Sequence, residues 1–320
     1  EPIEHKPQQG EFSHIQSLMR HIFGEQYELG MDYMQLLYLQ PTQKLPIVLL
    51  VSEERNTGKS TFLNFLKAVF ENNVTFNTNE DFRSQFNSDW AGKLLIVVDE
   101  VLLNRREDSE RLKNLSTTFT YKVEAKGKDR TEIAFFAKFV LCSNNEYLPI
   151  LIDAGETRYW VRKIMPLQSD DTNFLQKLKT EIPAFLYFLT QRKLSTAQES
   201  RMWFNPKLIY TAALQKIIRS NRNRLEIEMT ELLLDIMSNM NVESVSFCLN
   251  DLVTLLIYAQ VKVEKYQVRK VVQEVWKLTS AHNSLSYTAY EFAPHRECHY
   301  EPKRKTGRFY TITKEQLTAI

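Results

Sequence analysis

Short runs of consecutive apolar residues alternate with helical periodicity in the first half of the chain. Residues 47–51 and 93–98 are apolar runs of strand length, and residues 135–141 and 160–165 repeat this pattern. Strands that are buried on both faces have this composition. Residues 62–70 have apolar positions at helical spacing between the first two runs. This alternation predicts an α/β fold with a parallel sheet.

Helical periodicity dominates the remaining segments. Residues 12–40 carry apolar positions at helical spacing, interrupted by Gly24 and Gly30, so we expect two short helices there. Residues 174–193 form a helical stretch that would cap the sheet, and the pattern stays helical in three segments beyond residue 208. The predicted organisation is an N-terminal helical segment (1–45), an α/β core with a helical cap (46–200) and a C-terminal domain (201–320).

The composition restricts the chemistry only slightly. The 320 residues have a hydrophobic share of 43% and a formal net charge of +2, so any surface for nucleic acid must be local. Cys142, Cys248 and Cys298 form no Cys-x-x-Cys pair, which favours a reducing compartment. No apolar run is long enough to span a membrane, so no membrane partner is expected. The chain begins at Glu1 without a Met or a signal peptide, and we interpret it as a fragment of something longer.

A phosphate-binding loop is predicted between the first apolar run and the following helix. Residues 53–61 read Glu-Glu-Arg-Asn-Thr-Gly-Lys-Ser-Thr, and such a loop needs backbone N–H groups at a helix N-terminus. Gly58 permits close backbone approach, Lys59 neutralises β- and γ-phosphate oxygens, and Ser60 coordinates Mg²⁺. A chance match is the alternative, and Glu53 stands where a glycine is usual, so its carboxylate must point away. The residues expected to bind ATP and Mg²⁺ are Asn56, Thr57, Gly58, Lys59, Ser60 and Thr61.

Polar residues end the next two predicted strands. Asp99 and Glu100 would emerge at the carboxyl edge of the sheet, where Asp99 holds magnesium and Glu100 orients and deprotonates the attacking water. Asn144 would position water or sense hydrolysis. The alternatives are a solvated acidic turn and an ordinary Asn-Asn turn. We interpret residues 46–166 as a P-loop ATPase core.

The spacing of loop, acidic pair and asparagine resembles that of superfamily 3 helicases, the AAA+-type helicases of viruses, phages and mobile elements. It is particularly similar to phage primase-helicase proteins, and the resemblance covers most of the chain. It implies a P-loop AAA+-like core in a homo-hexameric ring that moves 3′ to 5′ on single-stranded DNA during replication. It also implies the cytoplasm of a bacterial host and a primase, either upstream in the same chain or separate.

The resemblance assigns a pore hairpin to residues 121–130. Lys126 and Lys128 match the alternating lysines that grip the DNA backbone, and Arg130 follows them. Like-charged side chains on both sides of Gly127 would bind phosphates. The alternative is a solvated basic turn.

The resemblance also implies an arginine finger in residues 155–163, presented to the ATP of a neighbouring subunit. Arg158 matches the finger position best and Arg162 second. Such an arginine stabilises charge on the transferring phosphoryl group. The alternative is a salt bridge beside a strand.

The C-terminal domain is expected to be a winged helix, in which a third helix and a basic hairpin contact DNA. Thr230 would cap the first helix, and the third would turn Tyr266 and Val275 inward. Residues 303–308 would form the basic hairpin, and protein contacts are the alternative use of such a domain. A zinc site around Cys298 lacks a fourth ligand at a fitting spacing. The residues expected to contact DNA, duplex included, are Arg269, Lys270, Lys303, Arg304 and Lys305.

These patterns together predict an ATP-dependent DNA helicase or translocase of a phage or mobile element. A DNA-stimulated ATPase that loads or melts DNA without processive unwinding is one alternative. A regulatory module that binds DNA and uses ATP as a switch is another.

Overall fold

The computed structural model describes residues 1–83, 92–103, 105–123, 131–153, 155–167, 171–221, 224–261, 263–293 and 299–319. The chain forms two compact units, Glu1–Asn221 and Arg222–Ile320. The expected boundary after residue 200 lies before helix α7 (Ala212–Ser220), whereas the observed boundary lies after it. The buried side chains of Leu214 and Ile217 explain this difference, because they pack α7 against the sheet of the first unit.

The first unit is built on a five-stranded parallel sheet, which confirms the predicted parallel α/β arrangement. Its strand order is β2 (Val74–Phe76), β3 (Leu95–Val98), β6 (Lys138–Ser143), β1 (Ile47–Val51) and β7 (Tyr159–Lys163). All residues of the central strands β1, β3 and β6 are buried, as continuous apolar runs require. The edge strand β2 was not predicted, because its three residues are too few to show the alternation of apolar and polar positions that indicates a strand.

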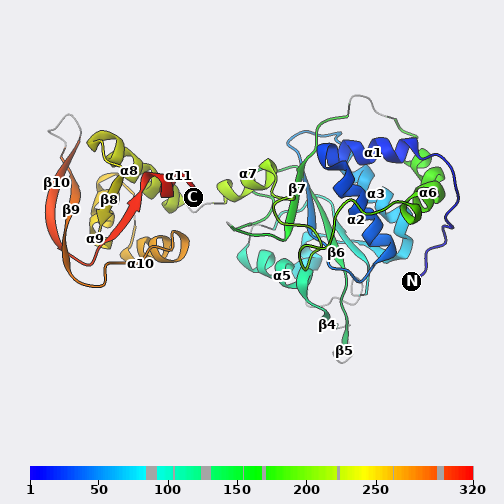
Figure 1. Cartoon of the computed structure of the whole chain (residues 1–320), viewed down its shortest axis with the longest axis horizontal. Helices are drawn as coiled ribbons and strands as arrows, with labels where there is room; N and C mark the ends of the chain where they lie inside the picture. Colours follow the sequence, from blue (N-terminus) through cyan, green and yellow to red (C-terminus); the bar gives the residue numbers. More distant parts are fainter. Residues whose placement is uncertain are drawn as a thin grey trace. The chain divides into compact units, whose positions relative to one another are not determined.

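Helices cover both faces of this sheet (Figure 1). The first face carries α1 (Ser13–Phe23), α2 (Tyr27–Leu39), α3 (Lys59–Phe70) and α6 (Phe174–Gln191), whose apolar side chains share a core with Val48 and Leu50. The second face carries α5 (Arg106–Thr117) and α7, which pack with Ile47 and Leu49. The predicted N-terminal segment 1–45 is therefore part of the sheet's own hydrophobic core.

The two glycines of the N-terminal helices have different roles. Gly24 has a positive φ of 51° and begins the short 3₁₀ turn Gly24–Gln26 between α1 and α2. Gly30 lies inside α2, so the prediction that it interrupts the helix was wrong. A Cβ atom at Gly30 would lie 2.3 Å from the ring of Phe23, so glycine there permits close packing of the ring.

A buried carboxylate fastens α2 to the segment after α6. Asp32 is fully buried and accepts hydrogen bonds from Arg192 (2.6 Å) and from backbone and hydroxyl groups of Ser195 and Thr196 (2.7–3.0 Å). Because Asp32→Ala removes the buried carboxylate that faces the buried guanidinium of Arg192, we expect it to lower the free energy of unfolding by about 3–5 kcal/mol in urea titrations. Glu28→Gln is the matched control, since Glu28 binds the same Arg192 but is 63% exposed, and should cost less than about 1 kcal/mol. Equal losses in the two variants would contradict this role.

Shorter elements complete the first unit. The 3₁₀ turn Glu71–Asn73 precedes β2, and helix α4 (Asn79–Arg83) follows it. Strands β4 (Thr120–Val123) and β5 (Thr131–Ala134) pair in antiparallel register.

No helix within the described residues has the length and apolar character to cross a membrane.

The second unit combines helices with two small antiparallel sheets. Its helices are α8 (Arg224–Met240), α9 (Leu249–Tyr258), α10 (Lys265–Lys270), which continues into the π-helical turn Val271–Val275, and α11 (Lys314–Ala319). Strand β9 (Leu285–Phe292) pairs with β10 (Tyr300–Gly307), and β11 (Tyr310–Thr313) pairs with β8 (Ser244–Phe247).

Three details of this unit differ from the prediction. Thr230 lies inside α8 and is not its cap, because the helix begins earlier than the apolar pattern indicates. Tyr266 on α10 and Val275 in the π-helical turn are 63% and 44% exposed, whereas Val268, Val271 and Val272 form the buried face. The basic residues 303–305 lie within strand β10 and not in a turn, because they pair in register with residues 287–289 of β9.

Candidate functional site

The carboxyl ends of β1, β3 and β6 bring the predicted site residues into one hydrogen-bonded cluster. Lys59 Nζ donates to Asn144 Oδ1 (3.0 Å), and Asn144 Nδ2 donates to Glu100 Oε1 (3.2 Å). Ser60 Oγ donates to Asp99 Oδ2 (2.7 Å). The cluster forms because β6 lies between β3 and β1, so that the polar residues after three neighbouring parallel strands meet at one edge.

The loop between β1 and α3 leads directly into the N-terminus of a helix. Gly58 (φ 80°) and Asn56 (φ 53°) have positive φ values, and α3 begins directly afterwards. Two loop carbonyls accept hydrogen bonds from other segments. The Thr57 carbonyl accepts from His21 Nε2 (2.9 Å), and the Asn56 carbonyl accepts from the N–H of Leu167 (3.0 Å). The backbone N–H groups of residues 56–60 donate to no acceptor among the described residues. Such an array at a helix N-terminus fits a phosphate group.

Lys59 is the cationic group of this loop. Its side chain is only 6% exposed and also donates to the hydroxyl groups of Ser52 and Thr57. Burial lowers the pKa of Lys59, and the charges around it, including Asp99 and Glu100, act in the opposite direction. A phosphate at the loop would supply the full anionic partner that the present neutral acceptors do not.

Glu53 points away from the loop interior. Its carboxylate is 55% exposed and lies 4.0 Å from Lys216 Nζ on α7. Its N–H donates to the buried carboxylate of Glu146 (3.2 Å), which also binds Lys163 (3.0 Å) and Lys216 (2.8 Å). The pKa of Glu146 lies below its usual value, because these two lysines outweigh the opposing effect of burial. Glu146 therefore fixes the start of the loop, a role that no sequence pattern indicated.

Glu100 occupies a strained turn after β3. Its φ is 60°, a conformation that is costly for a residue other than glycine. Asn79 on α4 holds this turn at both sides, donating to the Glu100 carbonyl (3.2 Å) and accepting from the N–H of Leu102 (2.9 Å). The turn keeps the Glu100 carboxylate exposed beside Asn144, where a water molecule can reach it.

The Ser60 and Asp99 oxygens fit a magnesium ion. Mg²⁺ is usually held by one or two protein oxygens together with substrate phosphates and water. The two side chains already lie within hydrogen-bond distance, and both are exposed at the mouth of the phosphate loop. Among the described residues, no three His, Cys, Asp or Glu side chains lie together so that they could hold a metal ion.

Arg158 lies at the opposite edge of the sheet. Its carbonyl accepts from the N–H of Ile47 at the start of β1, about 16 Å from the loop at the rise of an extended strand. Its guanidinium binds Glu156 through both carboxylate oxygens (2.8 and 2.7 Å) and is 27% exposed. Arg162, the second candidate, is less accessible, with 13% exposure and a hydrogen bond to Gln26 (3.0 Å).

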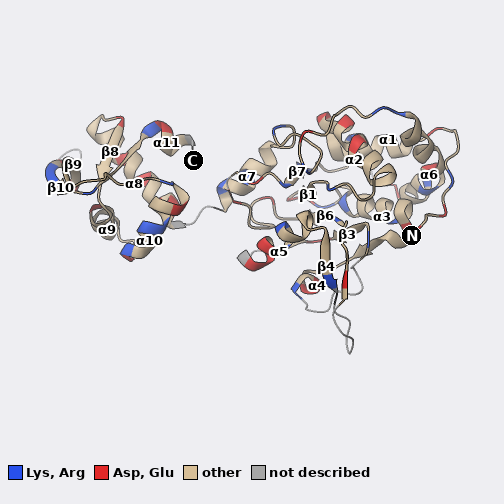
Figure 2. Ribbon diagram, turned by 60° about the horizontal axis from the view of Figure 1, so that its bottom comes forward, with Lys and Arg blue, Asp and Glu red and all other residues tan. Residues whose placement is uncertain are grey.

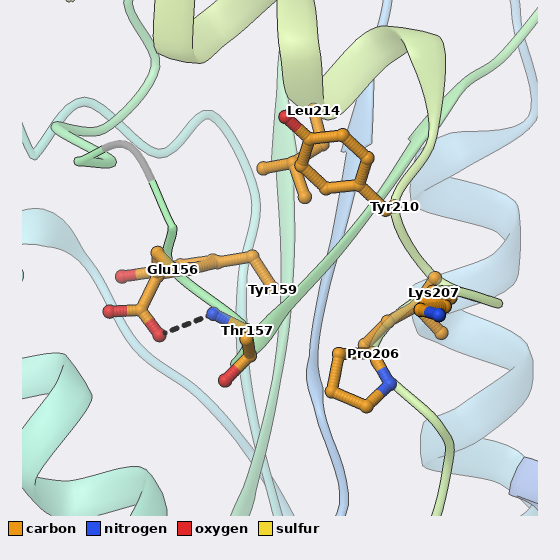
Figure 3. A pocket seen from close by; sticks show the side chains of 8 residues that line it. Glu156, Thr157, Tyr159, Pro206, Lys207, Tyr210 and Leu214 are labelled. Atoms are coloured by element: carbon orange, nitrogen blue, oxygen red, sulfur yellow. Dashed lines mark hydrogen bonds between the residues drawn. The ribbon is translucent and has the colours of Figure 1, made fainter.

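A pocket of about 260 Å³ is lined by Glu156, Thr157 and Tyr159, the sequence neighbours of Arg158 (Figure 3). Tyr159, Tyr210 and Leu214 give it a mainly apolar lining, and the Glu156 carboxylate accepts from the N–H of Thr157 (2.9 Å) there. Arg158 itself does not line this pocket, and its partly exposed guanidinium lies at the end of β1 away from the predicted phosphate loop of its own chain.

The expected pore hairpin is described only at its base. Val123 pairs with Thr131, so strands β4 and β5 flank the predicted loop. Lys126, Lys128 and Arg130 lie outside the described residues.

The basic residues of the second unit divide into two groups. Lys305 is held by Asp251 and Glu291 (2.8 Å each), and Lys303 by Glu291 (2.8 Å), while Arg304 donates to Ser286. Arg269 and Lys270 on α10 are exposed, as predicted. Figure 2 shows basic residues on both β10 and α10. Lys305 therefore stabilises the fold through its ion pairs, whereas Arg269 and Lys270 on α10 are exposed to solvent.

Known proteins match part of this chain in sequence. The family of unknown function DUF5906 matches residues 50–159, which include the loop, the acidic pair and the asparagine. The chain is 26% identical over 136 residues to the DNA primase-polymerase of Nitratiruptor phage NrS-1. The matched region covers 41% of this chain and 19% of the length of that protein.

Solved structures of the NrS-1 C-terminal region share the fold. One has a TM-score of 0.69 at 16% identity and covers 97% of this chain and 78% of that chain. Another has a TM-score of 0.65 at 14% identity, with 98% and 79% covered. The likeness at these identities concerns the fold, and it extends over both units.

Proposed function

We propose that this chain is the ATP-driven motor part of a phage or mobile-element replication protein, a DNA helicase or translocase. The observation that carries the proposal is the cluster of Lys59, Ser60, Asp99, Glu100 and Asn144 at one sheet edge beside an array of free loop N–H groups. The similarity to a phage primase-polymerase supports a role in DNA replication. The proposal includes a P-loop AAA+-like core for the first unit, with α1 and α2 packed on it, and a winged helix for the second.

Each residue of the cluster has a part in the proposed reaction. Residues 56–61 bind the triphosphate through backbone N–H groups, and Lys59 neutralises its terminal oxygens. Ser60 and Asp99 would hold Mg²⁺, which supplies further neutralisation of the phosphate charge. Glu100 accepts a proton from the attacking water, and Asn144 orients this water through the hydrogen bond it shares with Glu100.

DNA and neighbouring subunits complete the proposed motor. A ring of six copies would place Arg158 of one subunit against the ATP of the next, and the β4–β5 hairpins would face DNA in the centre. Single-stranded DNA is the proposed track, moved 3′ to 5′, with duplex contacts through Arg269 and Lys270 of the second unit. The proposed location is the cytoplasm of the bacterial host, with a primase activity as partner.

The experiment that tests this function measures ATP hydrolysis with and without single-stranded DNA, and strand displacement on a fork. We expect DNA to stimulate hydrolysis and ATP to drive displacement. Stimulation without displacement would favour a loader or melting factor. Slow hydrolysis that ignores DNA would contradict the motor and favour a regulatory switch.

Lys59→Met is expected to lower hydrolysis by about 10²–10³-fold and to stop displacement, because it removes a preorganised charge from the transferring phosphoryl group. Lys67→Met is the matched control, since Lys67 lies on the same helix but donates to the carbonyls of Glu71 and Val74. Equal activity in the two variants would exclude the loop as the nucleotide site.

A further inference from the structure

A second pocket, with a more polar lining, lies at the amino edge of the sheet, away from the phosphate loop. Its volume is about 530 Å³, and its lining combines the loop after α2 with the start of the β4–β5 hairpin and the segment after α6. Its lining includes Lys44, Phe119 and Arg201. None of the residues proposed to bind or hydrolyse ATP lines this pocket.

Two lysines in this region are buried without an acidic partner. Lys44 is 5% exposed and donates to the Phe135 carbonyl (2.8 Å), and Lys138 is 2% exposed and donates to the carbonyl of Pro41, a lining residue. Neither forms an ion pair with a carboxylate of the described residues, although buried lysines are normally paired. Burial lowers the pKa of Lys44 to about 8, and burial together with the charge of Lys44 lowers that of Lys138 to about 7. An anion in the pocket would offset the cost of burying the charge of Lys44, which lines it.

Phe119 adds an exposed aromatic surface to this cationic site. Its side chain is 75% exposed, and Lys44 Nζ lies 5.5 Å from its ring centroid. Its carbonyl accepts from the N–H of Phe135 (2.8 Å), which fixes its backbone at the base of the hairpin. An aromatic ring beside cationic groups is the arrangement that binds an unpaired base and its phosphate.

We propose that this pocket binds single-stranded DNA, with Phe119 stacking on one base and with Lys44 and Arg201 facing the adjoining phosphate. The inference rests on the proposed function for its DNA track and adds a contact at the base of the hairpin to those expected at its tip. Double-stranded DNA does not fit this site, because paired bases keep their faces stacked on one another.

The test is the affinity of the full chain for a fluorescein-labelled thymidine 20-mer, measured by anisotropy. We expect Phe119→Ala to weaken binding about 5–100-fold, and Phe119→Trp to retain it, since stacking depends on the ring. Phe76→Ala is the matched control, because Phe76 is also exposed (45%) but lies at the carboxyl end of strand β2, away from this pocket.

Arg201→Ala tests the phosphate contact. We expect it to reduce the slope of log affinity against log salt by about one.

Two outcomes would overturn the inference. The first is equal affinity of the Phe119→Ala and Phe76→Ala proteins for the 20-mer. The second is a loss in Phe119→Ala that persists on an abasic 20-mer, which has phosphates but no bases. Thermal melting of each variant separates these results from unfolding. Failure of the wild-type protein to bind the 20-mer would instead contradict the proposed DNA motor itself.

Discussion

Glu100→Gln is expected to lower the rate of ATP hydrolysis by about 10²–10⁴-fold, the range that a general base contributes. The amide has nearly the same shape, so it can keep the contact with Asn144 Nδ2 (3.2 Å), but it cannot accept the proton of the attacking water. Affinity for a non-hydrolysable ATP analogue should stay close to that of the wild type, because Glu100 does not belong to the phosphate loop. Single-turnover hydrolysis and analogue titration measure the two effects separately.

Glu107→Gln is the control for this substitution, since Glu107 is an exposed carboxylate in the first turn of α5, outside the cluster. It should hydrolyse ATP at the wild-type rate. If Glu100→Gln lost analogue affinity and hydrolysis together, Glu100 would act in binding and another base would have to be found. Unchanged hydrolysis in Glu100→Gln would leave the carboxylate as part of a solvated acidic turn.

The central strands and the residues at their ends could be predicted because one physical cause determines both. Strands β1, β3 and β6 are buried on both faces and so appear as uninterrupted apolar runs. The polar residues that follow them must reach the carboxyl edge, which places Asp99 and Asn144 near Lys59 without knowledge of any contact. The expectation that Glu53 points away also agrees with its exposure.

The residues that support the cluster could not be predicted, because their roles depend on distant segments. Glu146 binds Lys163 and Lys216, which come from β7 and α7, and Asn79 holds a turn more than twenty residues further along the chain. His21 reaches Thr57 only because α1 packs on the sheet. None of these residues belongs to a local motif.

Local sequence patterns predicted the wrong structure where contacts between distant elements decide it. Residues 303–308 are rich in basic residues and contain Gly307, which is typical of a turn, yet residues 303–305 lie in β10 with Lys305 paired to Asp251. An ion pair across elements cannot be inferred from charge in the sequence. The boundary after residue 200 lies before α7, because the helical pattern of α7 does not show that Leu214 and Ile217 pack on the sheet of the first unit.

Arg158→Ala is expected to lower ATP hydrolysis by about 10³-fold or more, the loss typical of an arginine finger. Arg158 and the predicted phosphate loop of the same chain lie at opposite ends of β1, so in the proposed ring the guanidinium would act on nucleotide held by a neighbouring subunit. Analogue affinity of the variant should therefore remain, and activity should return in part when Arg158→Ala and Glu100→Gln subunits are mixed. Some interfaces of such a mixed ring combine an intact Glu100 with an intact Arg158.

A structural role for Arg158 makes a different prediction, because its guanidinium now binds the Glu156 carboxylate through two hydrogen bonds. If that ion pair only supported the fold, Arg158→Ala would lower the thermal midpoint, and mixing with Glu100→Gln subunits would restore nothing. Arg158→Lys separates the two roles further, since lysine keeps a charge near Glu156 but loses the planar fork that contacts phosphate. Hydrolysis should stay low in this variant while the thermal midpoint recovers. A chain that stays monomeric with ATP analogue and single-stranded DNA would exclude the finger, because no neighbour would then be present to receive it.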